Sequence, residues 1–122
     1  MKVCVTADSQ DFNPQVDPRF GRCKYFFLID TDNNSSQIIE NTGKESSSGA
    51  GIAAAGLLVE KGAEAVITGN CGPKAFQVLT KSGIKIITGV SGGVWEALEN
   101  FSAGRLSETK EANVSAHFGM KR

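Results

Sequence analysis

Two glycine-containing turns of the sequence share one pattern, and only one of them holds a cysteine. Residues 67–76 read ITGNCGPKAF and residues 87–97 read ITGVSGGVWEA, so each copy joins an apolar run to a helical pattern through a Thr-Gly pair and a further glycine. Cys71 stands in the first copy, directly before the predicted helix. A thiol at a helix N-terminus is expected to have a lowered pKa, because the helix dipole stabilises the thiolate. The alternative is a small residue half-buried under the loop.

Cys23 and His117 are two further candidate metal ligands. Cys23 stands at the start of an apolar run and is expected at the same edge of a sheet as Cys71. Two strand spacings, roughly 10 Å, would separate the two thiols, which is too far for a disulfide but suits opposite ends of a multi-atom cluster. His117 is in the C-terminal tail, either folded over the site as a metal ligand or simply solvated.

The cysteine and histidine content excludes some other sites. Three cysteines without CxxC spacing and a single histidine are too few for a closed structural zinc site, and they argue against a disulfide framework. Cys4 lies within the first apolar run and is predicted to be a core residue. Phe76 and Trp95 fall on helical faces and are predicted to pack in the core instead of stacking on a ligand.

Arg19 and Arg22, in the stretch DPRFGR, are predicted to lie at the rim of the same edge. A guanidinium there could pair with an anionic ligand, since its planar fork of donors matches anionic oxygens. The alternative is a purely structural ion pair with Asp17 or Asp8. The sequence alone leaves both interpretations open.

The hydrophobic pattern predicts five strands and three helices in the order β β β α β α β α. The strands are expected at residues 2–7, 24–30, 36–41, 65–68 and 84–88. The first helix is predicted to follow an N-cap at Ser48, the second to open at Pro73, and the three helices to end at Gly62, Gly83 and Gly104. The stretch TDNN between the second and third strands has the residues of a hairpin turn, so those strands should be antiparallel. Right-handed crossovers then give a mixed α/β sheet with helices on its faces.

In that topology the strand-to-helix loops leave from one edge of the sheet, where ligands of open α/β sheets bind. Three helix N-termini face this edge, and their unpaired N–H groups favour an anion. Glycines there allow a ligand to approach the backbone. The glycines predicted to bind a cofactor are Gly49, Gly51, Gly69, Gly72, Gly89 and Gly92. The alternative is that these glycines only form tight turns.

Composition excludes several classes of partner. The 122 residues suit one domain, and thirteen basic and thirteen acidic residues cancel, which gives no electrostatic case for nucleic acid. The sequence has no polybasic run for a membrane surface and no apolar stretch as long as a membrane span. The N-terminus leads directly into a strand pattern without a signal peptide, so the expected location is the cytoplasm.

Four motifs together resemble the dinitrogenase iron–molybdenum cofactor biosynthesis family of small cofactor-carrier-like proteins. They are VDPRFGR (16–22), SSGAGI (47–52), VITGNCGPKAF (66–76) and ANVSAHFG (112–119). The resemblance covers residues 1 to about 104 almost without gaps.

That resemblance implies a ribonuclease H-like fold with strand order 3-2-1-4-5 and an antiparallel second strand. It also implies that the protein binds, stores or delivers an anionic metal–sulfur cluster without catalysis. The cluster would be the iron–molybdenum cofactor, its iron–sulfur precursor or a related molybdenum or iron cluster, and the partners would be cluster-assembly or acceptor proteins. Residues 1–104 would form the domain and residues 105–122 a polar tail, ordered only around 114–118.

Two other functions compete with that of a carrier. A two-metal nuclease would need several acidic residues around Mg²⁺, but after Asp8 the predicted first helix offers no acid before Glu60, and the turn TGNCG offers none. We therefore expect no metal-dependent nuclease activity. A nucleotide- or anion-binding regulatory module remains the alternative, although neither glycine turn contains a lysine and Lys74 is the nearest.

Overall fold

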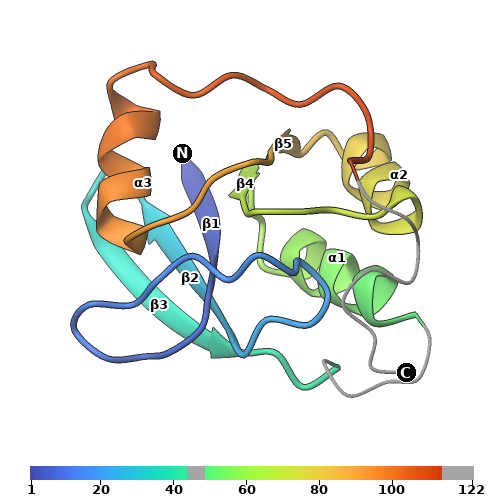
Figure 1. Ribbon diagram of the computed structural model, residues 1–122, viewed down its shortest axis with the longest axis horizontal. Coiled ribbons are helices and arrows are strands. Elements are labelled where there is room, and N and C mark those ends of the chain that lie inside the picture. The colour runs from blue at the N-terminus through green and yellow to red at the C-terminus, as the bar shows by residue number, and fades with distance from the viewer. Residues whose placement is uncertain (44–48, 114–122) are drawn as a thin grey trace.

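The chain forms a five-stranded mixed sheet in the order β3-β2-β1-β4-β5 (Figure 1). The structure is a computed structural model and describes residues 1–43 and 49–113. β2 is antiparallel to both of its neighbours, whereas β1, β4 and β5 are parallel. The strand order and the antiparallel second strand are therefore confirmed. The strands are β1 (Lys2–Ala7), β2 (Tyr25–Asp30), β3 (Ser35–Glu40), β4 (Ala65–Ile67) and β5 (Lys85–Ile87).

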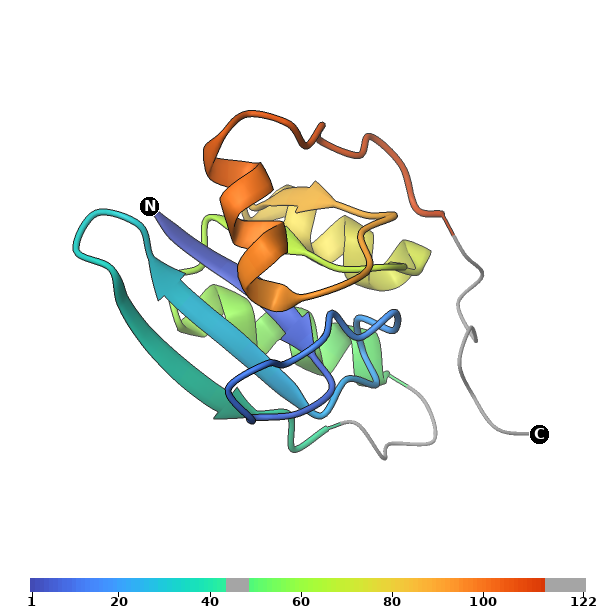
Figure 2. The same cartoon turned by 60° about the vertical axis from the view of Figure 1, so that its left-hand side comes forward.

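Three helices cover the two faces of this sheet. α1 (Ala50–Glu60) and α2 (Pro73–Lys81) lie side by side on one face, and α3 (Val94–Ser102) lies on the other (Figures 1 and 2). Each helix is followed by a glycine with a positive φ, at Gly62, Gly83 and Gly104, as predicted.

The predicted N-cap of the first helix is wrong. The cap is Gly49, which has a φ of 75° and provides no side-chain hydrogen bond, whereas Ser48 lies outside the described residues. The chain enters α1 through a left-handed conformation, which glycine adopts without the steric cost that a side chain would bring.

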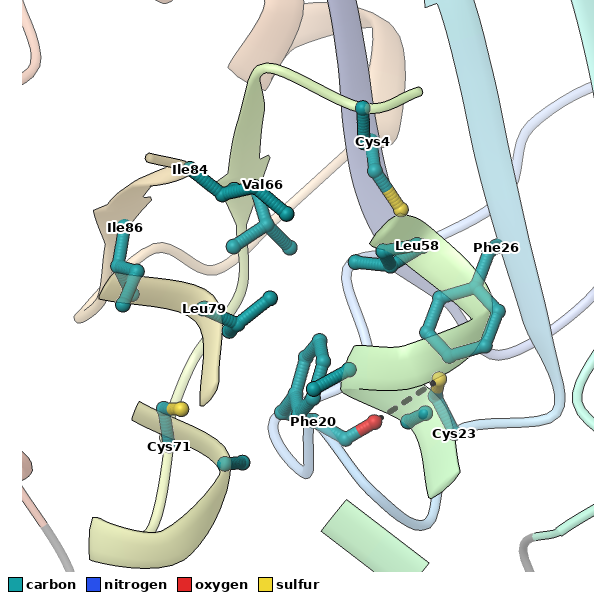
Figure 3. Close-up of a cluster of buried hydrophobic side chains, with 14 of the residues drawn as sticks. Cys4, Phe20, Cys23, Phe26, Leu58, Val66, Cys71, Leu79, Ile84 and Ile86 are labelled. Atoms are coloured by element: carbon teal, nitrogen blue, oxygen red, sulfur yellow. Dashed lines mark hydrogen bonds between the residues drawn. The ribbon is translucent and has the colours of Figure 1, made fainter. Parts of the chain in front are cut away.

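The side chains of the central strand alternate between two separate cores. Cys4 points to the face covered by α1 and α2, while Val3 and Val5 point to the face covered by α3. Both faces of β1 are therefore buried, which explains its unbroken apolar run. Figure 3 shows the first core, in which Phe26, Leu58, Val66, Leu79 and Ile86 are all buried.

The loop of residues 8–24 runs across the carboxyl edge of the sheet (Figure 1). Near its start, the Pro14 carbonyl accepts a hydrogen bond from the backbone N–H of Val94, at the first turn of α3, at 2.9 Å. Farther along, the Phe20 N–H donates to the Asn70 carbonyl at 3.1 Å. The loop therefore connects the N-terminus of α3 to the turn between β4 and α2.

Residues 105–113 lie along the outer edge of β5. The Thr109 N–H donates to the Ile86 carbonyl at 2.6 Å, and the Thr88 N–H donates to the Thr109 hydroxyl at 2.9 Å. This segment covers backbone groups that an edge strand would otherwise expose. The division of the chain at residue 104 stays a prediction, and the stretch 114–118 lies outside the described residues. Among the helices described, none is long and apolar enough to span a membrane.

Candidate functional site

The N-termini of α1 and α2 meet at the carboxyl edge of the sheet. Their N-caps are Gly49 and Gly72, and neither cap provides a side-chain hydrogen bond. The two helices approach closely, because a Cβ placed on Gly51 would lie 3.1 Å from the Cβ of Ala75. Two positive helix ends are thus brought together at this edge, where the sequence analysis expected three.

Gly21 makes this arrangement possible, and it was missed by the sequence analysis. A Cβ on Gly21 would lie 2.7 Å from the backbone nitrogen of Gly51 and 2.8 Å from its Cα. Only glycine lets the loop backbone pass this close to the first turn of α1. The available signal was the glycine inside DPRFGR, between an aromatic residue and Arg22.

Gly69 is packed against the loop of residues 8–24 and does not face open space. A Cβ at Gly69 would lie 2.6 Å from the Cα of Pro18, so the loop backbone fills this side of the turn. A close approach within the protein is enough to require glycine here.

The second glycine turn, between β5 and α3, is engaged by the same loop. Gly89 and Gly92 have φ values of 79° and 91°, and the Gly92 carbonyl accepts the N–H of Val16 at 2.8 Å. The Val94 N–H at the start of α3 is already donated to Pro14. The structure therefore brings α1 and α2 together with loop residues 19–22, whereas loop residues 14–16 lie against the turn that leads into α3.

Cys71 lies directly before α2, but its thiol is buried. The side chain is only 1% exposed and belongs to the core of Ala75 and Leu79 (Figure 3). Burial raises the pKa of the Cys71 thiol to about 12. The predicted lowering of this pKa is wrong, because desolvation of the thiolate outweighs the favourable helix dipole.

Cys23 and Cys4 are buried in the same core. The Cys23 thiol donates to the Phe20 carbonyl at 3.3 Å, and burial raises the pKa of both thiols above their usual value. Figure 3 shows Cys71 and Cys23 well separated, with the Phe20 side chain between them in that view. Cys4 is a core residue, as predicted.

No conventional metal site is present in the part of the chain that the structure describes. Within residues 1–43 and 49–113, no three or more His, Cys, Asp or Glu side chains are grouped so that they could hold a metal ion. His117, the predicted third ligand, lies outside these residues.

Arg19 forms one of the structural ion pairs that the sequence left open. Its Nε donates to the Asp17 carboxylate at 3.4 Å, and its backbone N–H donates to the same oxygen at 2.9 Å. Asp17 is buried, while the Arg19 side chain is 40% exposed and so also faces solvent at this edge. Arg22 is half-buried, and its N–H donates to the Arg19 carbonyl at 3.2 Å. Asp8 accepts a hydrogen bond from the Gln15 N–H at 3.1 Å.

Asn113 is the other site residue that the sequence analysis missed. Its side-chain oxygen accepts the Cys71 N–H at 2.8 Å, and its own N–H donates to the Cys71 carbonyl at 3.3 Å. The Asn113 amide nitrogen also donates to Asn70 Oδ1 at 3.1 Å and to the Gly69 carbonyl at 3.4 Å. The only signal in the sequence was its place in the tail motif ANVSAHFG.

The fold and this edge define a small α/β domain whose candidate ligand site lies where glycine-capped helices meet. The chain belongs to the dinitrogenase iron-molybdenum cofactor family, whose sequence profile matches residues 1–104. Family membership indicates a cofactor-binding or carrier role.

Relatives cover nearly the whole chain. An uncharacterized protein of Methanocaldococcus jannaschii is 32% identical over 111 residues, which are 88% of this chain and 91% of that protein. The apo form of the orange protein from Desulfovibrio gigas is 35% identical with a TM-score of 0.89, over 93% of this chain and 96% of that one. A Thermotoga protein of the DUF35 family, solved by NMR, is 35% identical in sequence with a TM-score of 0.78. The match covers 91% of this chain and 98% of that one.

Proposed function

We propose that the protein binds an intact anionic metal–sulfur cluster as cargo, and stores or delivers it without chemical turnover. The cluster is of the iron–molybdenum cofactor type, its iron–sulfur precursor or a related cluster, and the partners are cluster-assembly or acceptor proteins. The observation that carries this proposal is the meeting of the α1 and α2 N-termini beside Arg19 and Arg22.

An anion at this edge would be stabilised by several groups. Each helix N-terminus contributes about 0.3–1 kcal/mol to an adjacent negative charge. Gly49 is exposed, and a Cβ at this position would meet no atom of residues 1–43 or 49–113 within 4 Å, so those residues leave the backbone there open to a ligand. Arginine adds charge-assisted hydrogen bonds, which are roughly twice as strong as neutral ones.

The donor set suits a cluster that arrives already assembled. The described residues offer no cage of thiolates, and their three thiols are buried with raised pKa values. Backbone N–H groups and guanidinium groups can hold the sulfur surface of a preformed cluster and release it again. Of the proposed metal ligands Cys71, Cys23 and His117, Cys71 lies in the turn itself, and ligation by its sulfur would require loss of the thiol proton.

Anaerobic reconstitution tests this function. Apo protein is mixed with isolated cofactor, or with iron, molybdate and sulfide, and then passed through gel filtration with metal and sulfide analysis of the protein peak. We expect the wild type to retain metal, Cys71→Ser to retain markedly less, and Cys23→Ser to be affected less. Arg19→Gln and Arg22→Gln should weaken retention, with Arg105→Gln, an exposed arginine beyond α3, as the matched control. A wild type that elutes without metal would refute the proposal. Full retention of metal by Cys71→Ser would show that the Cys71 thiol is not a ligand of the cluster.

A nucleotide- or anion-binding regulatory module is the second candidate. The same uncapped helix N-termini would accept a phosphate group, and neutral buried thiols have no part in such a site. Equilibrium dialysis of apo protein with ATP, GTP and dinucleotides separates the two functions, since micromolar binding would favour the module. Magnesium-dependent nucleic-acid cleavage that Asp8→Asn abolishes would contradict both.

A further inference from the structure

Two aromatic side chains are exposed where the loop of residues 8–24 meets α3. Phe12 is 95% exposed and Trp95 is 45% exposed. Trp95 does pack against Phe27, with ring centroids 5.6 Å apart at 73°, but nearly half of its surface remains in solvent. The prediction that Trp95 is a core residue was therefore only half right. We name Phe12 and Trp95 the aromatic patch.

The loop that carries Phe12 is held against α3. The Trp95 indole N–H donates to the Phe12 carbonyl at 3.2 Å. Two residues later, the Pro14 carbonyl accepts the Val94 N–H at 2.9 Å. On either side of this stretch, the Asp8 N–H donates to the Gln15 carbonyl at 3.0 Å, and the Gln15 N–H donates to the Asp8 carboxylate at 3.1 Å. An aromatic ring on a pre-organised loop needs little further ordering on binding, which favours a role as an anchor in an interface.

Three carboxylates lie on the loop and the helix that carry the aromatic patch. Asp8, Asp11 and Glu96 are all exposed, and none forms an ion pair with another residue in the described ranges. Glu96 is next to Trp95, and its Oε1 lies 3.3 Å from the position that a Cβ on Gly92 would take. The chain as a whole has a net charge of zero, so this local excess of negative charge is a property of the surface.

We propose that the aromatic patch and its three carboxylates form a docking surface for a second protein that offers an apolar face bordered by Lys or Arg. The opposite charges would direct the encounter and fix its orientation. Lipid headgroups and nucleic acid are disfavoured, because their negative charge would face Asp8, Asp11 and Glu96. α3, which carries Trp95, covers the face of the sheet opposite α1 and α2 (Figure 2), and Trp95 packs there against Phe27, away from the point where the N-termini of α1 and α2 meet.

A second copy of the chain is the less favoured occupant. An apolar groove of about 500 Å³ lies between α2 and residues 110–112, with Lys74, Lys81 and Lys110 among its lining residues. That groove has the required chemistry, but a contact between it and the aromatic patch would be head-to-tail and would extend into chains unless it closed into a ring. Self-association is therefore an outcome of the test.

Trp95 is the only tryptophan of the chain, so its fluorescence reports on this surface. The probe is a synthetic amphipathic helical peptide with a leucine face flanked by arginine, and its control carries glutamate in place of arginine. We expect the arginine peptide alone to shift Trp95 emission to shorter wavelength in a saturable manner, with affinity that falls several-fold at high salt. Phe12→Ala should weaken this binding tenfold or more, and Glu96→Gln should reduce its salt dependence. Ile52→Ala, an exposed apolar residue on α1, is the matched control.

Several results would overturn the docking surface. These are equal binding of the glutamate peptide, no binding of the arginine peptide, or unchanged affinity in Phe12→Ala. Phe12-dependent self-association in sedimentation velocity would assign the patch to a second copy, and Phe12-dependent binding to vesicles of anionic lipid would assign it to a membrane. Near-UV circular dichroism of the Trp95–Phe27 pair confirms that each variant is folded.

Discussion

Asn113 and Cys71 are 42 positions apart in the sequence, yet the Asn113 side-chain oxygen accepts the Cys71 backbone N–H at 2.8 Å. The Asn113 N–H returns a bond of 3.3 Å to the Cys71 carbonyl. The Cys71 N–H lies just before the N-terminus of α2, where an anionic ligand would accept hydrogen bonds from backbone N–H groups. The C-terminal segment therefore already uses one donor of the candidate site.

Asn113→Ala should make the turn that contains Cys71 less rigid. Loss of the side-chain bonds is expected to cost about 1 kcal/mol of folding stability and to speed amide hydrogen exchange at Cys71. The measurement is hydrogen exchange of the peptide that contains residues 66–76. Asn100→Ala is the control, since among the described residues the Asn100 side chain accepts a hydrogen bond from exposed Arg105 alone. Unchanged exchange at Cys71 would show that the bond contributes nothing in solution.

Thiol reactivity should be slow at neutral pH. The pKa of Cys71 is raised from its ordinary value of 9.0 to about 12, so its alkylation by iodoacetamide at pH 8 should be on the order of a thousandfold slower than that of a free cysteine. The rate should keep rising with pH until the pH approaches this pKa of about 12. Peptide mapping should still find Cys71 labelled first, Cys23 next and Cys4 only on unfolding. Rapid labelling of Cys71 at pH 7 would contradict its burial, and rapid labelling of Cys4 would contradict the central place of β1.

The buried thiols should also make stability fall at high pH. A thiol with the ordinary value of 9.0 in the unfolded chain ionises there first, while native Cys71 stays neutral until its pKa of about 12. The unfolded state therefore binds fewer protons between these values, and the free energy of unfolding decreases as pH rises through this window. Each such thiol contributes a slope of about 1.4 kcal/mol per pH unit.

Urea denaturation under reducing conditions from pH 8 to 11 measures this slope. Cys71→Ser has no titrating thiol at that position, so its stability should fall less steeply than that of the wild type. Comparison of the two proteins cancels the titration of lysine and tyrosine. Parallel pH profiles would show that the Cys71 thiol is not desolvated.

Gly21→Ala should destabilise the fold, because its Cβ would meet the backbone of Gly51 at 2.7 Å. Backbone atoms cannot move aside as a flexible side chain would, so a cost of about 1–3 kcal/mol is expected. Gly56→Ala is the matched control, since a Cβ at this position in α1 meets no atom of the described part of the chain within 4 Å and should stabilise the helix by up to about 1 kcal/mol. Equal stability of the two variants in urea would refute the close approach.

Valine substitutions at Gly72 and Gly92 should separate ligand binding from folding. Gly72 has a φ of −78° and a ψ of 169°, which a β-branched residue also adopts, so Gly72→Val should stay folded and lose cluster retention. Gly92 has a φ of 91°, so Gly92→Val is expected to lose about 1–3 kcal/mol of stability through backbone strain alone. Thermal unfolding and anaerobic reconstitution of both variants check these outcomes. A stable Gly92→Val would contradict the left-handed backbone.

The elements and their order could be predicted from the sequence alone. Apolar runs, the hairpin residues before β3 and the glycines after each helix act through local backbone preferences, and these predictions were confirmed in the strand order and at Gly62, Gly83 and Gly104. The position of the candidate edge follows from that topology alone, because parallel strands place their carboxyl ends together.

The chemistry of that edge, by contrast, depends on tertiary packing. The helix dipole at Cys71 is a local property. The pKa of the Cys71 thiol, however, depends on the exclusion of water by the surrounding core, most of which comes from distant parts of the chain. The Gly21–Gly51 approach and the Asn113–Cys71 bond likewise join segments 30 and 42 positions apart. Desolvation and close contact between distant segments arise from packing in three dimensions, and neither has a local pattern in the sequence.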